Sequence, residues 1–354
     1  FPVYEGVKRL ALKQFCDDLM SMDKVSEERL DVIVFQEHYN LKNYKYIDNY
    51  IENGMKVIAI DHNTYLFPFF EKTQHIKNYK SVTQLEQIRH ETYPKVHAVV
   101  TLSPTDALVW KHAGVRSRYI PNPTTFQNSK IEERKRQNVL FVGRIHPQKQ
   151  PELLLQMMQN LNEINPDAHL TILGAPEKAI QQKIINSHIQ NTEALGFRLN
   201  VDDFYKNSSV MVVTSSYEGF SLVIAEAISK GLAVVSFEMP YLVLMSCGVI
   251  QVPKNDTIKL AQEVNKLLQN ETLRQKIVQE GQIYLKKMND LVIPRWNELF
   301  DKVMNDEEID FADEAKQKDV DKILFEEVDY IKQSLKNLRK EKLKIKREHR
   351  HKEI

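Results

Sequence analysis

Two glutamates stand out in the segment S-S-Y-E-G-F-S-L-V-I-A-E-A-I-S-K-G, which covers residues 215–231. Glu218 precedes a glycine, and Glu226 lies in an apolar run that ends at Gly231. A carboxylate is rarely buried without a partner, because the loss of its hydration is costly. Each glutamate is therefore a candidate for binding a polar ligand. The alternative is that Glu218 belongs to an ordinary turn and Glu226 to a buried hydrogen-bond network.

The local pattern places these two carboxylates apart. A strand predicted over residues 210–216 leads into a helix that starts near Ser221, a good N-cap residue, so Glu218 precedes the helix and Glu226 lies inside it. The paired carboxylates of a glycoside hydrolase face each other across about 5 to 9 Å, so this arrangement argues against that class. Free N–H groups at the helix start favour an anion. They belong to Gly219, Phe220, Ser221 and Leu222.

A second candidate site is V-G-R-I-H-P-Q-K-Q-P, residues 142–151. Gly143 allows a ligand to approach the backbone closely. Arg144 offers a planar pair of donors, and Lys149 offers a compact ammonium group. Together these groups could bind a diphosphate. A solvated basic loop is the alternative, and the combination with the 215–231 segment favours the diphosphate.

A third candidate is His62 in I-A-I-D-H-N, residues 58–63, which directly follows a predicted strand in the first half of the chain. His38 in F-Q-E-H-Y-N occupies a similar place. A histidine at a strand end can act on a substrate, but it is more often a surface side chain or a hydrogen-bonded structural one. The spacing alone leaves both possibilities open.

These candidates must be positioned by the elements around them. In the first half, short apolar runs alternate with helical patterns, which indicates a parallel sheet with right-handed crossovers. Strands are predicted at 31–35, 56–60, 97–103 and 118–123, and helices at 9–22, at 45–54 and in the polar stretch before residue 97.

The alternation restarts after a polar, highly charged segment at 127–137, which reads as a linker. Strands are predicted at 138–143, 169–174, 193–197, 210–216, 233–237 and 249–252, and helices at 151–164, within 215–231 and at 256–270. Apolar runs of this kind are typical of strands covered by helices on both faces. The predicted fold is α/β, with two tandem Rossmann-like domains whose ligands bind beyond the carboxyl ends of the strands.

Composition limits the partners. The 354 residues carry 49 Lys and Arg against 48 Asp and Glu, a formal charge of +1, so bulk charge gives no reason to coat nucleic acid or a membrane. Cys16 and Cys247 lie far apart, which fits a reducing compartment rather than a disulfide framework. No apolar run approaches the roughly 18 to 20 residues of a membrane-spanning helix. We expect a cytoplasmic protein, either soluble or peripheral on the inner face of the cell membrane.

The motifs at 138–149 and 215–231, each placed after an apolar strand, resemble those of the retaining glycosyltransferases of family 4, the glycosyl transferases group 1 with the GT-B fold. The resemblance extends over roughly residues 25–300. It implies two Rossmann-like domains, a nucleotide-sugar donor held mainly by the second domain, and no metal. Among such donors a UDP-sugar is expected.

The resemblance also implies roles for individual residues. Arg144 and Lys149 are similar to the residues that neutralise the donor diphosphate. Glu218 is similar to the glutamate that binds hydroxyls of the transferred sugar, and Glu226 to the one that holds the ribose. His62 is similar to the histidine that faces the reacting sugar.

Further positions match less closely. The segment at Phe197 resembles the one beside the base, and the segment at Asn122 resembles the exit from the first domain. Ser221 stands where many relatives carry a glycine. The Gly-rich loop that begins the family's first domain is not found, and the chain starts at Phe1 without Met or a signal-peptide pattern, so we expect part of the first domain to be absent.

The predicted domains are residues 1–126 on the acceptor side and 127–285 for the nucleotide-sugar, followed by a crossover helix at 286–304 and a charged helical tail at 305–354. Within the tail, six acids occur at 306–314 and ten Lys or Arg at 332–352. Heptad spacing suggests a seam that a coiled coil, an anionic membrane surface or solvent could cover. The seam comprises Leu324, Val328, Ile331, Leu335, Leu338 and Ile345, with Lys342 at one position.

The leading functional hypothesis is a retaining glycosyltransferase that moves a sugar from a nucleotide-sugar to a glycan, polymer or lipid-linked acceptor in cell-surface polysaccharide synthesis. Nucleotide-sugar epimerases and phosphorylases share the fold and are rivals. A non-catalytic glycosyltransferase-like partner that binds or stabilises another subunit is a rival of a different class. The presence of Glu218, Glu226, Arg144 and Lys149 argues against a non-catalytic partner, whereas the short first domain argues for one.

Overall fold

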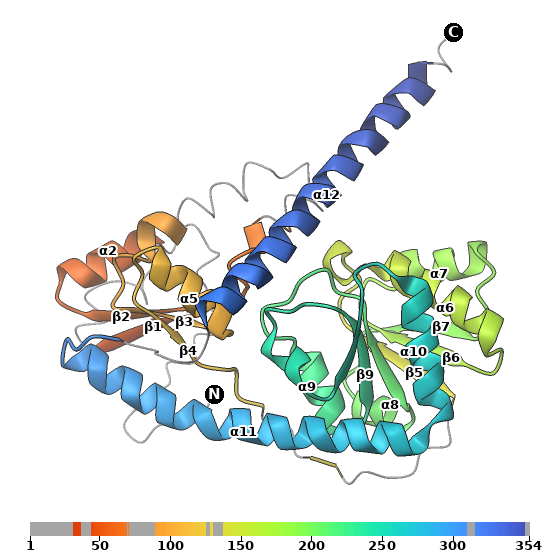
Figure 1. The fold of residues 1–354 in the computed structure, drawn as a ribbon, viewed down its shortest axis with the longest axis horizontal. Coiled ribbons are helices and arrows are strands. Elements are labelled where there is room, and N and C mark those ends of the chain that lie inside the picture. The colour runs from red at the N-terminus through yellow and green to blue at the C-terminus, as the bar shows by residue number, and fades with distance from the viewer. Residues whose placement is uncertain are drawn as a thin grey trace. The chain divides into compact units, whose positions relative to one another are not determined.

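A computed structural model describes residues 31–36, 44–68, 70, 89–124, 128–129, 137–309 and 316–350. The chain divides into two compact units (Figure 1). The first unit comprises Phe1–Ile120 and Arg295–Ile354, and the second comprises Pro121–Pro294. The helix predicted at 9–22, Cys16, His38 and most of the predicted linker at 127–137 lie outside the described residues.

The first unit contains a 4-stranded parallel sheet in the order β1-β2-β3-β4. Its strands are β1 (Val32–Phe35), β2 (Lys56–Asp61), β3 (Ala98–Thr101) and β4 (Ser117–Tyr119). Helices α2 (Tyr44–Glu52) and α5 (Pro104–His112) belong to the same unit. The apolar residues of β2 and β3 are buried, as expected for strands covered on both faces. The core gathers large side chains such as Ile47, Tyr50 and Trp110.

The second unit contains a 6-stranded parallel sheet in the order β10-β9-β8-β5-β6-β7. Its strands are β5 (Asn138–Val142), β6 (His169–Leu173), β7 (Thr192–Gly196), β8 (Val210–Val213), β9 (Ala233–Phe237) and β10 (Val249–Val252). The chain runs outward from β5 in one direction and from β8 in the other. The switch point of the sheet therefore lies between β5 and β8, and ligands of doubly wound sheets bind beyond the strand ends at this point.

Helices cover both faces of the second sheet. They are α6 (Pro151–Ile164), α7 (Lys178–Asn186), α8 (Asp202–Lys206), α9 (Leu222–Ser229) and α10 (Thr257–Gln269). Figure 1 shows α6, α7 and α10 on one side of the sheet and α8 and α9 on the other. α6 starts with proline at a position where the missing N–H costs nothing, and its buried residues recur at helical spacing. The α/β prediction with two Rossmann-like halves is confirmed.

The long helix α11 (Glu271–Met304) replaces the separate crossover helix predicted at 286–304. It runs through residues 285–286 without a break, and Pro294 lies inside it as the last residue that the second unit contributes. Asn289 accepts from the Thr124 N–H (2.8 Å) and donates to the Thr124 carbonyl (3.0 Å). These bonds hold the chain just after Asn122 against α11, within the second unit.

The tail folds as helix α12 (Gln317–Arg350), which belongs to the first unit. Ile331 is buried and the Tyr330 ring lies 6.5 Å from that of Phe70, whereas Val328 and Leu335 are each 38% exposed. The predicted heptad seam is therefore split, because the helix packs its 320–331 face on its own unit. The side chains of Leu338, Lys342 and Ile345 lie outside the described residues. No described helix is both long and apolar enough to cross a bilayer.

Candidate functional site

The loops that follow β5 and β8 are tied together at the switch point of the second sheet. The Ser216 N–H donates to the Gln148 carbonyl (2.8 Å), and the Gln148 side-chain amide donates to the Tyr217 carbonyl (3.0 Å). The Thr214 hydroxyl donates to the Lys149 carbonyl (2.6 Å). Because neighbouring strands supply the two loops, their side chains share one rim of the sheet.

This arrangement brings Lys149 and Glu218 into contact. Lys149 Nζ lies 2.5 Å from Glu218 Oε1, and the Ser215 hydroxyl donates to the same oxygen (2.6 Å). The backbone N–H of Glu218 donates to the Tyr241 hydroxyl (3.2 Å). Only 15% of the Lys149 side chain and 9% of the Glu218 side chain are exposed. The site therefore presents a largely buried ion pair that Ser215 and Tyr241 hold in place.

The start of α9 lies beside this ion pair in sequence. The N–H groups of Gly219, Phe220 and Ser221 have no acceptor among the described residues, and the first N–H groups of a helix have none within it. Leu222 is an exposed side chain at the first helical position. These amides could bind an anion, because the helix dipole adds to their positive charge.

Ser221 precedes the helix as predicted, but its side chain does not cap it. Its φ is +64°, in the left-handed region, whereas a capping serine is normally extended. The hydroxyl therefore accepts from no helix N–H, and it is buried without a hydrogen-bond partner. The residue keeps a conformation that glycine adopts more readily.

Gly143 and Arg144 follow β5 directly. A Cβ added at Gly143 would lie 3.6 Å from Lys149 Cε, an ordinary contact, so packing alone does not require glycine there. Arg144 is exposed and forms no hydrogen bond or ion pair with another described residue. Gly174 is the stricter position, because a Cβ there would lie 1.8 Å from the Gly143 carbonyl oxygen. Sequence reasoning missed it, although it directly follows the apolar run at 169–173.

Glu226 lies on α9, and its carboxylate has a partner that sequence reasoning also missed. The buried Tyr205 of α8 donates its hydroxyl to Glu226 Oε2 (3.0 Å). Burial raises the pKa of Glu226, while the Tyr205 hydrogen bond and the charge of Lys230 lower it and Asp202 raises it. Asp202 and Lys230 also form an ion pair (2.9 Å) between α8 and the end of α9. The predicted network around Glu226 is real, and it still leaves one carboxylate oxygen for a ligand.

Phe197 follows β7 and is 69% exposed. An exposed phenylalanine beside a strand end offers a flat apolar surface on which a planar ring could stack. The Arg198 guanidinium donates to the Phe197 carbonyl (3.1 Å).

His62 belongs to the first unit, where it follows β2. Its Nε2 lies 3.1 Å from the Gln36 side-chain oxygen, so it pairs with the residue that follows β1. The preceding Asp61 is buried and forms an ion pair with Arg89 (2.6 Å), and the Trp110 indole N–H donates to it (3.3 Å). Buried charges of this kind fix the loop that carries His62.

A second buried carboxylate, Asp106, holds the same loop from α5. It accepts from the Tyr65 N–H (2.8 Å), from the Thr64 hydroxyl (3.0 Å) and from the Ser103 hydroxyl (2.6 Å). Burial raises the pKa of Asp106 to about 6, and these hydrogen bonds oppose that rise. The loop after β2 is therefore anchored by two carboxylates that face the interior.

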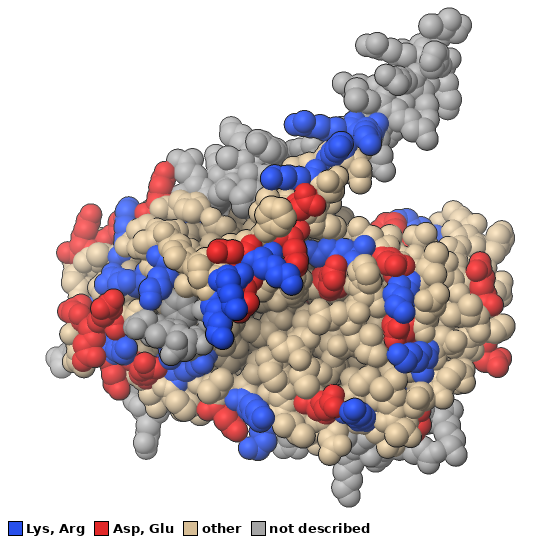
Figure 2. Space-filling view, in the orientation of Figure 1, with Lys and Arg blue, Asp and Glu red and all other residues tan. Residues whose placement is uncertain are grey.

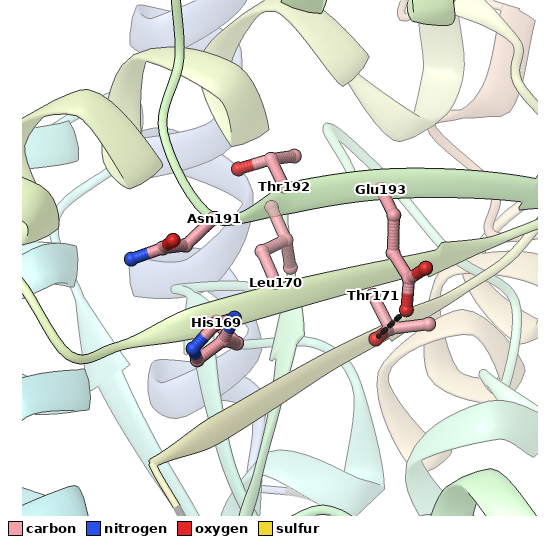
Figure 3. A pocket seen from close by; sticks show the side chains of 6 residues that line it. All are labelled: His169, Leu170, Thr171, Asn191, Thr192 and Glu193. Atoms are coloured by element: carbon pink, nitrogen blue, oxygen red, sulfur yellow. Dashed lines mark hydrogen bonds between the residues drawn. The ribbon is translucent and has the colours of Figure 1, made fainter.

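A cavity of about 210 Å³ lies at the other end of the second sheet (Figure 3). It is lined by His169, Leu170, Thr171, Asn191, Thr192 and Glu193, and the Thr171 hydroxyl donates to Glu193 (3.1 Å). These residues start β6 and β7, so the cavity is remote from the carboxyl ends of the strands. Within the described ranges no three His, Cys, Asp or Glu side chains gather as a metal site.

Comparison with known proteins shows which family this part of the chain resembles. Residues 123–283 match the family "Glycosyl transferases group 1". The chain is 25% identical over 232 residues to the amylovoran biosynthesis glycosyltransferase AmsD of Erwinia amylovora, a match that covers 64% of this chain. It spans only 60% of the length of that relative.

Solved structures show the same fold. The sucrose-phosphate synthase of Thermosynechococcus elongatus superposes with a TM-score of 0.68 at 15% identity, over 85% of this chain and 81% of that one. Anabaena HepE, solved in complex with UDP and glucose, superposes with a TM-score of 0.60 at 15% identity, over 84% of each chain. The predicted resemblance to the glycosyl transferases group 1 is confirmed. Residues 123–283 are thus similar to a glycosyl transferases group 1 domain, and the chain has a GT-B fold.

Proposed function

We propose that the protein is a retaining glycosyltransferase that uses a nucleotide-sugar donor. The observation that carries this proposal is the contact between Lys149 and Glu218 at the switch point of the second sheet. A buried cation and a buried carboxylate beside open amide groups suit a ligand that combines a diphosphate with a hydroxyl-rich sugar.

Lys149, Arg144 and the α9 amides are assigned to the diphosphate. When the bond between the sugar and the phosphate breaks, negative charge grows on the phosphate oxygen that leaves. Fixed cations and helix N–H groups stabilise charge that develops in this way. Lys149 has three N–H donors, so it can keep one on Glu218 while it donates another to a phosphate. The exposed Arg144 supplies a second cation from the same loop.

Glu218 is assigned to the transferred sugar, and Glu226 to the ribose of the donor. Both carboxylates are acceptors for hydroxyl donors, and each is held by a buried hydroxyl, from Ser215 and Tyr205 respectively. The exposed Phe197 is assigned to the base. A protein of similar fold suggests which base: HepE was solved with UDP and glucose, so we propose a UDP-sugar, with a hexose as the transferred group.

The reaction proceeds on one face of the sugar. The bond from the anomeric carbon to the phosphate oxygen breaks, and its electron pair stays on the phosphate. The acceptor hydroxyl attacks the same face, and its proton passes to the departing phosphate oxygen. Glu218 is engaged by Lys149 and Ser215, so it serves as a sugar ligand rather than as a nucleophile. His62 is assigned a role in the transfer of the sugar, as the family resemblance implies.

The acceptor is proposed to be a glycan, polymer or lipid-linked saccharide of the cell surface. AmsD, the relative named above, is named for amylovoran biosynthesis, which supports a polymeric product. The fold alone does not select an acceptor, because proteins with the same fold act on many.

A panel of UDP-, GDP- and ADP-sugars tests the proposal, with released nucleotide as the readout. The wild type should release nucleotide from one class, and NMR of the product should show retention at the anomeric carbon. Glu218→Ala and Arg144→Ala should each lower turnover by about two to three orders of magnitude. Lys183→Ala, which removes an exposed cation of α7 in the same unit, is the matched control and should have no effect. Turnover that Glu218→Ala and Arg144→Ala leave unchanged would refute the assigned roles.

We further propose that the second half of α12 docks on an anionic lipid surface, as a cytoplasmic protein would at the inner face of the cell membrane. Lys and Arg gather along the described part of this helix (Figure 2). Residues 335–350 carry eight Lys or Arg against two Glu. The side chains described between residues 335 and 340 are all exposed. Lys336 and Lys340, like Lys342 and Lys346, are spaced four apart, where like charges weaken a helix. A lipid surface neutralises this charge, whereas a parallel second copy would double it.

Truncation after Ser334 tests the docking proposal. The full chain should bind vesicles of phosphatidylglycerol at low salt and ignore phosphatidylcholine, since each basic residue contributes about 1 kcal/mol near an anionic surface. Truncation should abolish that binding and leave the size in gel filtration unchanged. Binding that survives truncation would contradict the proposal, and a smaller particle after truncation would assign the helix to a second copy instead.

A further inference from the structure

Glu226 has a single hydrogen-bond donor for its carboxylate among the described residues, the hydroxyl of Tyr205. Tyr205 is fully buried, so its hydroxyl has a fixed position and cannot exchange its partner for solvent. It donates to Glu226 Oε2, and Oε1 keeps its capacity to accept. The carboxylate is therefore oriented before any ligand arrives.

The helix that carries Tyr205 is tied to α9 by this contact and by an ion pair. α8 has only 5 residues, and a helix of that length is not stable by itself. Its buried tyrosine anchors it to the interior, and Asp202 anchors it to Lys230 at the end of α9 (2.9 Å). Three charged or polar groups thus face Glu226 from α8 and α9. They are Tyr205, Asp202 and Lys230.

We propose that Tyr205 is a positioning residue that aligns Glu226 with the two hydroxyls of the donor ribose, and that it thereby sets the preference for a ribonucleotide over a deoxyribonucleotide. This inference rests on the function proposed above. Two neighbouring hydroxyls can both donate to an ionised carboxylate whose orientation is fixed. Without the tyrosine hydroxyl, the carboxylate rotates freely and is protonated more easily, because a donor that favours its charged form is gone.

The test compares the binding of UDP and of 2′-deoxy-UDP by calorimetry in the wild type and in Tyr205→Phe. The wild type should prefer UDP by about tenfold or more, the value of a hydrogen bond to a charged group. Tyr205→Phe should reduce this preference at least about fivefold. As the pH is lowered, Tyr205→Phe should lose UDP binding at a higher pH than the wild type does, since the pKa of Glu226 rises when the tyrosine hydroxyl is removed.

Two further variants separate positioning from a structural role. Tyr284→Phe removes a tyrosine hydroxyl that donates to the Val243 carbonyl (3.0 Å) in the same unit, and it should leave the ratio of the two affinities unchanged. In a Glu226→Gln background, Tyr205→Phe should have no further effect on that ratio, since the tyrosine acts through the glutamate. Glu226→Gln alone should lower the ratio, which tests the pair even if Tyr205→Phe does not fold.

The outcomes are distinct. A wild type that binds neither nucleotide refutes the proposed function. A wild type that binds both equally, or a Tyr205→Phe protein that binds both more weakly but with the same ratio, overturns the inference and leaves the proposed function standing. A ratio of UDP affinity to 2′-deoxy-UDP affinity that falls in Tyr205→Phe and not in Tyr284→Phe supports the positioning role of Tyr205.

Discussion

Replacing Lys149 by methionine removes the ammonium group that neutralises Glu218 while it keeps most of the side-chain volume. The pair is largely buried, since only 15% and 9% of the two side chains are exposed. Removing one partner of a buried pair costs about 3 to 5 kcal/mol. The Ser215 hydroxyl still donates to the carboxylate in the variant, so we expect the lower end of that range. In a domain of roughly 150 to 250 residues, about 3 kcal/mol lowers Tm by about 6 to 12 °C.

The double variant Lys149→Met/Glu218→Gln should recover much of this loss, with a coupling energy of about 2 kcal/mol. Hydrogen exchange of the amides in β5 and β8 is a suitable readout, because Trp110 and Trp296 both lie in the first unit and do not report on the second. Lys183→Met is the matched control: its partner Glu152 is 61% exposed and Lys183 itself 49%, so it should cost less than about 1 kcal/mol. A Lys149→Met protein as stable as the control would refute the buried pair.

Three other predictions follow from the backbone and from one buried acid. Gly174→Ala should lower the free energy of unfolding by about 2 to 4 kcal/mol, because its Cβ would lie 1.8 Å from the Gly143 carbonyl oxygen. Gly114 also has a positive φ but lies in open space, so Gly114→Ala should lower it by only about 1 kcal/mol. Denaturant titrations measure both values. Ser221→Gly should raise the stability of the second unit by about 1 kcal/mol in calorimetry, since it relieves a left-handed serine with an unpaired buried hydroxyl, and an unchanged Tm would count against this reading. Burial raises the pKa of Asp106 from 3.8 to about 6, so its proton stabilises the fold below about pH 4 and that stability is lost as the pH rises through 6. Asp106→Asn should remove about 3 kcal/mol of this pH dependence, measured by tryptophan fluorescence, and a slope equal to the wild type would contradict it.

The strands and most helices of the second unit could be predicted closely from the sequence. β9 and α6 have the predicted bounds, because a short, largely apolar run and a helical pattern that starts with proline leave few alternatives. The sequence also placed Lys149 and Glu218 on one rim of the sheet. Their direct contact, and the contact of Tyr205 with Glu226, depend on how far apart two loops or two helices come to rest, which no local pattern encodes.

Two local sequence patterns, the N-cap serine and the heptad spacing of the tail, led to predictions that the structure corrects. Ser221 has the residue type of an N-cap, but the backbone enters α9 in a left-handed conformation that turns its hydroxyl away. The heptad pattern of the tail identified an apolar stripe correctly, yet such a stripe can pack on another chain or on its own domain. Here the residues around Ile331 pack on their own unit, which leaves Val328 and Leu335 outside the contact.

The central claim is that Lys149 binds the diphosphate of a nucleotide donor. Calorimetric titration of UDP and of uridine into the wild type and into Lys149→Met tests it most directly. The wild type should bind UDP much more tightly than uridine, and Lys149→Met should reduce that advantage by about tenfold or more, the value of a charge-assisted hydrogen bond. Uridine should bind both proteins equally. An advantage of UDP over uridine that is the same in both proteins would show that the phosphates bind elsewhere.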